Sequence, residues 1–166
     1  MANSTAQTVL GSDLMLFVGG KSIGFATNHT LTINSEMLEN ASKDHASGLW
    51  KGTTIKSLSW QASTENLFAY DAEGNTLQDL YNLMITRQSV DLILAIKLPG
   101  TAVENTIGLS VTEGGWSPET AVGSIQYKGK AFISNINVNA PNGDNATFGV
   151  NFEGAGELSM VTITQP

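Results

Sequence analysis

The feature that most constrains this fold is an alternation of apolar and polar residues with a period of two. It is clearest in ATFGVNFEG, at 146–154, and it recurs in HTLTINS, at 29–35. Successive side chains of a β-strand point to opposite faces, so each stretch predicts a strand with one buried face. In TTIKSLSWQAS, Trp60 falls on the buried face and Ile55 has the opposite parity from Leu58, which predicts a β-bulge or a change of face between them.

Turn residues separate these strands. Gly-Gly at 19–20 and Asn-Gly at 142–143 supply the positive φ angles that tight hairpins need. One helix is predicted at 76–86, because apolar residues recur there at i, i+3, i+4 and i+7, with Asn75 and Gln78 as a capping box. We therefore expect a mostly β fold, a β-sandwich or barrel-like domain of about eight or nine strands with one flanking α-helix.

The chain of 166 residues is expected to form one domain. Residues 1–12 are polar and small and predict a flexible N-terminal segment, so the single domain is expected to span 13–166. Periodicity is lost at 36–52, which predicts an extended loop, and a second excursion is predicted at 98–123, with a short strand within 107–111.

Composition and charge exclude several classes of function. Fifteen acidic residues against eight basic ones give a net charge of -7, and no window gathers the lysines into a patch that could neutralise a row of phosphates. The absence of cysteine excludes disulfides, thiolate zinc sites and a thiol nucleophile. The start of the sequence has no positive n-region and no long apolar run, so we expect the chain to be made and folded in a cytoplasm.

The residues with catalytic chemistry do not form a convincing site. Asp44, His45 and Ser47 are near neighbours in the predicted loop, where a rigid triad is difficult to hold, so we interpret them as solvated loop residues. The other histidine, His29, has no metal-ligand spacing relative to His45. We therefore expect no metal and no cofactor, and a small hydrolase is the weakest of three hypotheses.

Four acidic residues could in principle act as paired carboxylates in glycoside hydrolysis: Glu65, Asp71, Glu73 and Asp79. Turns and helix starts also favour acidic residues through capping and the helix dipole. The structural interpretation is therefore preferred.

Two large apolar residues, Leu49 and Trp50, stand at the end of the predicted loop. Such side chains are usually buried against another surface, which is either another copy of the chain or the parent domain. Trp50 and Trp116 both lie in irregular segments, where a sugar-binding platform would also place them. A carbohydrate-binding β-sandwich is therefore the second hypothesis.

Several elements follow one another in a recurring order. They are a glycine-turned hairpin, the strand ATNHTLTI, a loop with acids and a lysine ending near a Trp, the strand LSWQAS and ENLF, and then a Leu-rich helix and the strand VDLILAIK. This order resembles that of the major tail tube proteins of long-tailed bacteriophages and their prophages. The resemblance covers 12–97, and after Lys97 it is one of architecture only.

This resemblance implies a structural virion protein that self-assembles into hexameric rings, which stack into a tube for genome delivery. The loop would be the contact arm between subunits, with Lys43, Asp44, Leu49 and Trp50 at the interface. Partners would be further copies and other tail proteins at the tube ends, while DNA passes without specific binding and no membrane is involved. The protein would be located in the virion tail after assembly in the cytoplasm of the bacterial host. Related tubes also occur in contractile tails and secretion-type injection machines.

A polar strand face is the candidate lining of the bore. Asn135, Asn137 and Asn139 line one face of a predicted strand, which is either solvated in a monomer or turned to the lumen of a tube. A lining of uncharged polar residues and acids would give DNA no cation to hold.

Overall fold

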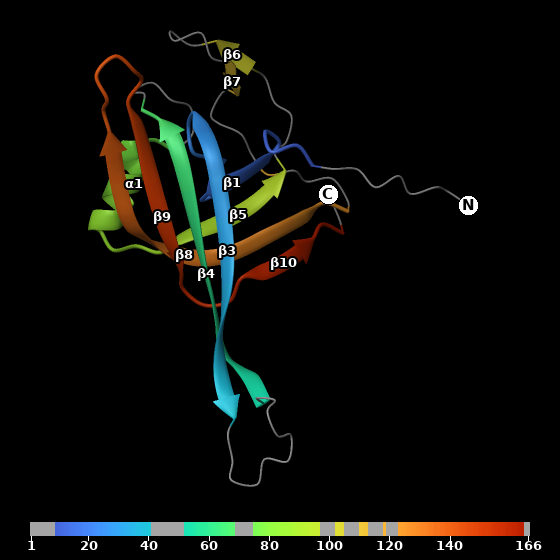
Figure 1. Ribbon diagram of the computed structural model, residues 1–166. Helices are drawn as coiled ribbons and strands as arrows, with labels where there is room; N and C mark the ends of the chain where they lie inside the picture. The colour runs from blue at the N-terminus through green and yellow to red at the C-terminus, as the bar shows by residue number, and fades with distance from the viewer. Residues whose placement is uncertain are drawn as a thin grey trace.

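The computed structural model describes residues 9–40, 52–68, 75–96, 102–104, 110–112, 118 and 123–164 (Figure 1). Its elements are β1 (Leu14–Val18), β2 (Lys21–Ser22), β3 (Ala26–Asn40), β4 (Gly52–Leu67), α1 (Leu77–Ile85), β5 (Val90–Ile96), β6 (Ala102–Glu104), β7 (Ser110–Thr112), β8 (Ile125–Asn139), β9 (Thr147–Gly154) and β10 (Ser159–Thr162). The expected mostly β fold with one flanking helix is confirmed for this part of the chain.

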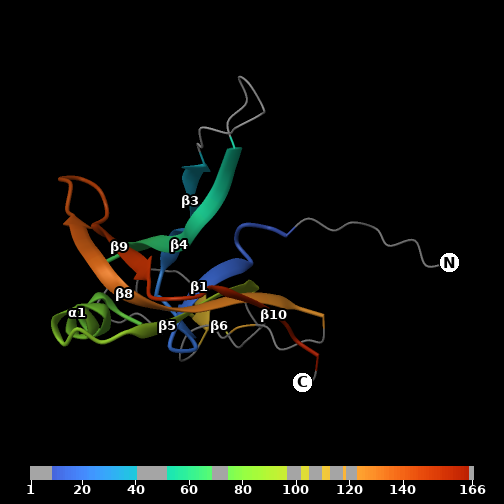
Figure 2. The ribbon, with the colours of Figure 1, turned by 90° about the horizontal axis from the view of Figure 1, so that it is seen from below.

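Eight strands form one open antiparallel sheet. Its order is β2-β1-β5-β8-β9-β4-β3, and β10 pairs with the first residues of β8. Figure 2 shows that the sheet bends strongly, so that β3 and β4 rise away from the layer of β5, β8 and β10. VDLILAI, which is apolar on both sides, forms β5 between β1 and β8. The small sheet β6–β7 comes from the predicted excursion.

The core lies on one face of the large sheet. Phe148, Val150 and Phe152 of β9 are buried, and the alternation predicted for this strand is confirmed. Each such side chain contributes about 1.5–3 kcal/mol when it leaves water. The same face continues through Ala62 of β4, and α1 packs on it with Leu80, which is completely buried.

Trp60 is a core residue, as predicted, and is 4% exposed. Its indole lies against the backbone of Gly129 and of Gly154, where a β-carbon on either glycine would overlap the ring. The indole N–H donates a hydrogen bond of 3.0 Å to the carbonyl oxygen of Gly156. Because Ser59 and Leu58 beyond it are exposed, Trp60 is the last core residue of β4 on the side of the β3–β4 hairpin.

The helix is confirmed, but its predicted cap is wrong. Thr76 is the N-cap residue: its hydroxyl accepts from the Asp79 N–H at 3.4 Å, and the Asp79 carboxylate accepts from the Thr76 N–H at 3.1 Å. This capping box lies one residue later than the predicted pair of Asn75 and Gln78. Asn75 instead donates from its side-chain amide to the carbonyl oxygens of Val18 and Lys21, which ties the start of the helix to the β1–β2 turn.

The β3–β4 hairpin is longer than the sequence predicts. The extended loop was expected from residue 36, but β3 continues to Asn40 and β4 begins at Gly52. Both strand ends lack the burial alternation that reveals a strand, because this part of the hairpin stands clear of the sheet and its side chains on both faces are exposed (Figure 1). The bulge predicted between Ile55 and Leu58 is confirmed, since the register shifts between Glu36 and Met37 opposite these residues.

The glycine turns also agree with the sequence. Gly19 and Gly20 have φ angles of 62° and 85°, and Gly143 has a φ angle of 84° in the β8–β9 turn. These are left-handed conformations that favour glycine.

Among the described residues, no helix is long and apolar enough to cross a membrane.

Candidate assembly surfaces

Several residues singled out from the sequence lie outside the described residues. These are the expected interface residues Lys43, Asp44, Leu49 and Trp50, the loop residues His45 and Ser47, the acids Asp71 and Glu73, and Trp116. The first six of these lie between Asn40 and Gly52, the described ends of the β3–β4 hairpin. Their roles therefore stay predictions.

The described part of the hairpin carries an apolar row that we call the hairpin stripe: Ile33, Met37, Ile55 and Leu58. These four side chains are 58–69% exposed. Ile33 pairs with Trp60, and Met37 pairs with Ile55 after the bulge, so the stripe continues the core face of the sheet. It is an exposed apolar surface without a covering element among the described residues.

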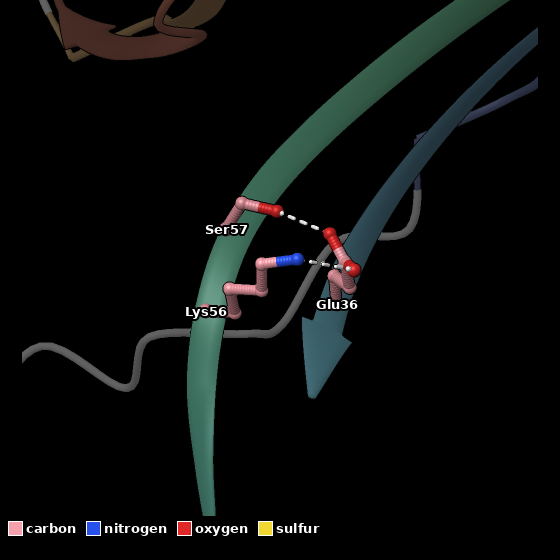
Figure 3. Close-up of polar contacts among 3 residues, drawn as sticks. All are labelled: Glu36, Lys56 and Ser57. Carbon is pink, nitrogen blue, oxygen red and sulfur yellow. Dashed lines mark hydrogen bonds and ion pairs between the residues drawn. The ribbon is translucent and has the colours of Figure 1, made fainter. Parts of the chain in front are cut away.

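The bulge is held by a polar contact. The Glu36 carboxylate accepts from the Lys56 ammonium at 3.1 Å and from the Ser57 hydroxyl at 3.0 Å (Figure 3). An exposed ion pair of this kind contributes at most about 1 kcal/mol. Because Lys56 and Ser57 are adjacent where the register shifts, the contact favours the bulged geometry.

A second apolar surface lies between α1 and β8, and we call it the helix groove. It has a volume of about 630 Å³, and all of its lining residues are uncharged. Its apolar lining includes Phe68, Leu77, Tyr81, Ile85, Ile136 and Val138. Tyr81, Ile85 and Val138 are 54–60% exposed, so the helix leaves much apolar surface uncovered.

The sheet face opposite α1 is polar. A register shift between Ile133 and Asn135 turns Ile136 and Val138 toward the helix and places Asn135, Asn137 and Asn139 on the other face, where all three are exposed.

A polar row crosses this face through the paired residues Asn135, Asn151, Ser63 and Thr30 of four adjacent strands. Part of the row borders a shallow hollow of about 150 Å³. Where this row crosses β8, β9, β4 and β3, the sheet therefore has one apolar and one polar face.

Several strand edges are unpaired among the described strands, and those of β3 and β8 border the same part of the sheet. β3 pairs only with β4, so its outer edge is open over 15 residues. β8 pairs with β5 only as far as Ala131, so the edge of β8 on that side is open from Phe132 to Asn139. Open edges of this length pair readily with another chain.

The described residues show no arrangement for catalysis. None of their histidine or acidic side chains form a group of three that could hold a metal ion. Asp79 is used in the helix cap, as the structural interpretation of the acids predicts. Burial lowers the pKa of His29 to about 4, so it is neutral at pH 7, and no carboxylate lines the cavity beside it.

The sequence analysis missed the hairpin stripe and the helix groove. Ile33 and Leu58 follow the same alternation as core residues, so the pattern assigns them to a buried face. No local pattern distinguishes the stripe from a core face, because the outer ends of β3 and β4 lack the alternation that reveals a strand and their full length is seen only in the structure.

The comparisons with known proteins agree with one another. The chain matches the family described as phage tail tube protein over residues 19–160, so the match continues well past Lys97, where the sequence resemblance becomes one of architecture only. No curated protein matches the chain significantly.

Solved structures with similar folds include three from virus-like tails and particles. One, titled as the tail of an empty gene transfer agent particle with C6 symmetry, has a TM-score of 0.67 and 17% identity, and the match covers 95% of this chain and 100% of that one. The virion of a native gene transfer agent particle gives a TM-score of 0.66 and 15% identity with the same coverage. The SPP1 tail tube gives 0.61 and 9% identity, covering 95% of this chain and 81% of that one. The family match shows that this chain belongs to the phage tail tube proteins, and it is a structural component of the virion tail and not an enzyme.

Proposed function

We propose that six copies of this chain close into a ring and that the rings stack into the tail tube through which the genome passes. The observation that carries the proposal is the pair of open edges on β3 and β8. They lie at opposite sides of the four-strand segment β8-β9-β4-β3. The six-fold number is supported by the similar gene transfer agent tail, whose title gives C6 symmetry.

Ring closure follows from the difference between the two edges. Pairing β3 of one copy with the second half of β8 of the next joins two different surfaces, and such a heterologous contact gives a ring when its rotation closes. Each copy would then add four strands to one continuous barrel. Closure would remove both open edges, which otherwise favour aggregation.

The polar face is the proposed lining of the bore, with Asn135, Asn137 and Asn139 turned to the lumen. Uncharged polar side chains hold no phosphate, and the net charge of -7 adds a weak repulsion, so DNA would pass without specific binding. Lys128 and Lys130 also lie on this face, in the first half of β8, and Lys130 is the register partner of Asp91 in β5. The helix face would form the outer surface.

The β3–β4 hairpin is the proposed contact arm, with Lys43, Asp44, Leu49 and Trp50 in the sequence between Asn40 and Gly52. The exposed hairpin stripe supports this role, because it needs a partner surface. Other tail proteins would meet the tube at its two ends. The same architecture would serve a tube of a contractile tail or of a secretion-type injection machine.

Electron microscopy of the purified chain at high concentration tests the assembly. We expect six-fold rings and stacked tubes. A sample that stays monomeric at all concentrations would refute the proposal.

Labelling tests the lining of the bore, because the chain has no cysteine of its own. In Asn137→Cys, a maleimide on a large polyethylene glycol should label the monomer but not the interior of a tube. The matched control is Asn82→Cys, on an exposed position of α1 outside the helix groove, which should be labelled in both states. Equal labelling of both variants in tubes would exclude Asn137 from the lumen.

A further inference from the structure

We propose that the helix groove of each copy receives the hairpin stripe of a copy in the next ring, and that this contact stacks the rings. The inference rests on the proposed function and deepens it, since it names the two surfaces that join one ring to another. Each surface is an apolar patch with exposed side chains on the described chain, and the proposed occupant of the groove is a second copy.

The two surfaces lie at opposite ends of the molecule. The groove is at the end of β4, where Phe68 follows Leu67, and the stripe is near its beginning, at Ile55 and Leu58. Ile55 and Leu67 are separated by twelve residue steps, which span about 40 Å in an extended strand. Figure 1 shows the same separation, with α1 beside the upper part of the sheet and the outer hairpin below it. One copy therefore cannot bury its stripe in its own groove.

Opposite placement of two different surfaces is the requirement for a filament. A heterologous contact that repeats by translation does not close, so further copies can always add to the end of the filament. Because each copy has one stripe and one groove, every copy within a tube would bury both. The ring at one end of the tube would keep its six stripes exposed, and the ring at the other end would keep its six grooves exposed. At each end a different tail protein would have to supply the missing surface.

The chemistry of the two surfaces is matched. The stripe has four aliphatic or thioether side chains, and the groove is lined by uncharged residues, so no charge is left unpaired when they meet. The groove volume of about 630 Å³ is within the range of roughly 300–1,000 Å³ that is typical of binding pockets. The charged contact of Glu36, Lys56 and Ser57 lies at the bulge and not within the stripe.

The hairpin is also suited to reach another copy. Trp60 fixes β4 at the point where the hairpin leaves the sheet, and beyond it both strands twist away from the body (Figures 1 and 2). A two-stranded ribbon twists more strongly than a wide sheet. The stripe is therefore presented beyond its own sheet, although it starts on the same face as the core.

Charge substitutions in the groove test the contact. Ile85→Asp should leave the monomer folded and the rings intact, because Ile85 is exposed, and should raise the protein concentration needed for tube growth about ten-fold or more. The matched control is Asn82→Asp, which adds the same charge to the same helix outside the groove and should leave tube growth unchanged. Tubes that grow from Ile85→Asp as from the unmodified chain would overturn the proposal.

Mixing separates the two halves of the contact. Leu58→Asp has a defective stripe and an intact groove, and Ile85→Asp has the reverse. Each variant alone should give only single rings, whereas a mixture of preformed rings should give double rings joined by the one intact pair of surfaces. If the mixture contains only single rings, stripe and groove are not partners.

Cross-linking identifies the ring to which the partner belongs. In assembled Leu58→Cys/Tyr81→Cys, a short bis-maleimide should give covalent ladders longer than six subunits, because each copy would join copies above and below it. The control pair Leu38→Cys/Tyr81→Cys uses the opposite hairpin face, since Leu38 follows Met37 in β3, and should give no ladder.

A ladder from the test pair that ends at six would place the contact within a ring and overturn the stacking role. Absence of rings from the unmodified chain would instead refute the proposed function and the stacking contact with it. The two failures are therefore distinguishable.

Discussion

Gly154→Ala is the substitution whose effect follows most directly from the structure. A β-carbon at Gly154 would lie 2.6 Å from Cδ2 of Trp60 and closer still to two other indole atoms. The ring cannot move away easily, because its other end lies over Gly129, where the nearest indole atom is 2.5 Å from the ideal β-carbon position. Any displacement also lengthens the hydrogen bond from the indole to Gly156.

The magnitude combines two terms. Overpacking a well-filled core costs about 1–3 kcal/mol, and weakening the indole hydrogen bond costs about 0.5–1.5 kcal/mol. We therefore expect Gly154→Ala to lower the free energy of unfolding by roughly 2–4 kcal/mol, from a total of about 5–15 kcal/mol for an ordinary domain. For a chain of this size, the melting temperature should fall by roughly 5–15 °C.

Urea unfolding of the monomer measures this loss, and a double-mutant cycle assigns it to the indole. Gly11→Ala is the control, because a β-carbon there meets nothing within 4 Å, and its stability should be unchanged or slightly higher. In a Trp60→Leu background, Gly154→Ala should cost less than about 1 kcal/mol. An equal cost with and without the indole would show that the glycine is required for another reason.

Three further predictions concern the helix, a buried histidine and the hairpin tip. Thr76→Ala should remove the hydroxyl that caps α1 and lower stability by about 1 kcal/mol, which a thermal melt will detect, whereas no change would mean that Asp79 caps the helix alone. Burial lowers the pKa of His29 from 6.5 to about 4, so the folded protein disfavours the protonated imidazole. Protonation of His29 therefore does not reduce the stability of the fold above pH 6.5, and it reduces that stability progressively as the pH falls toward 4. Urea unfolding should therefore give about 3 kcal/mol less stability from this residue at pH 4 than at pH 7, and His29→Gln should remove that difference. Leu49→Asp or Trp50→Ser should block oligomerisation in sedimentation experiments while the melting temperature of the monomer stays within a few degrees, and collapse of the monomer would assign these residues to the core.

The sequence predicted those parts of the fold in which local pattern and tertiary environment agree. The alternation around Phe148 and Phe152 was sufficient for β9, because one face of that strand is buried along its length. The apolar spacing correctly predicted the helix, but the predicted cap at Asn75 was one residue too early. Asn75 binds the β1–β2 turn instead, and Thr76 caps the helix. That competing tertiary contact cannot be inferred from the order of residues alone.

The candidate surfaces were harder to predict, because exposure is a property of the assembled sheet. The sequence placed Asn135, Asn137 and Asn139 on one strand face, and they do share an exposed face. It could not show that Ile33 and Leu58 lie beyond the covered part of the sheet, since an apolar residue has the same pattern whether its neighbour is the same chain or another copy. The helix groove depends on how far α1 covers β8, which no local pattern encodes.

Two register shifts, one in the β3–β4 pair and one in the β8–β9 pair, keep the polar row and the apolar surfaces on opposite faces of the sheet. Ile133 and Ile136 of β8 are three residues apart, and so are Ile55 and Leu58 of β4, a spacing that would place each pair on opposite faces of a regular strand. A register shift at each site returns both members to the core face. In β8 the shift leaves the asparagines together on the polar face, and in β4 it completes the hairpin stripe. Apolar residues three apart within a strand therefore indicate where a bulge allows one sheet to keep a polar lining and an apolar contact surface on separate faces.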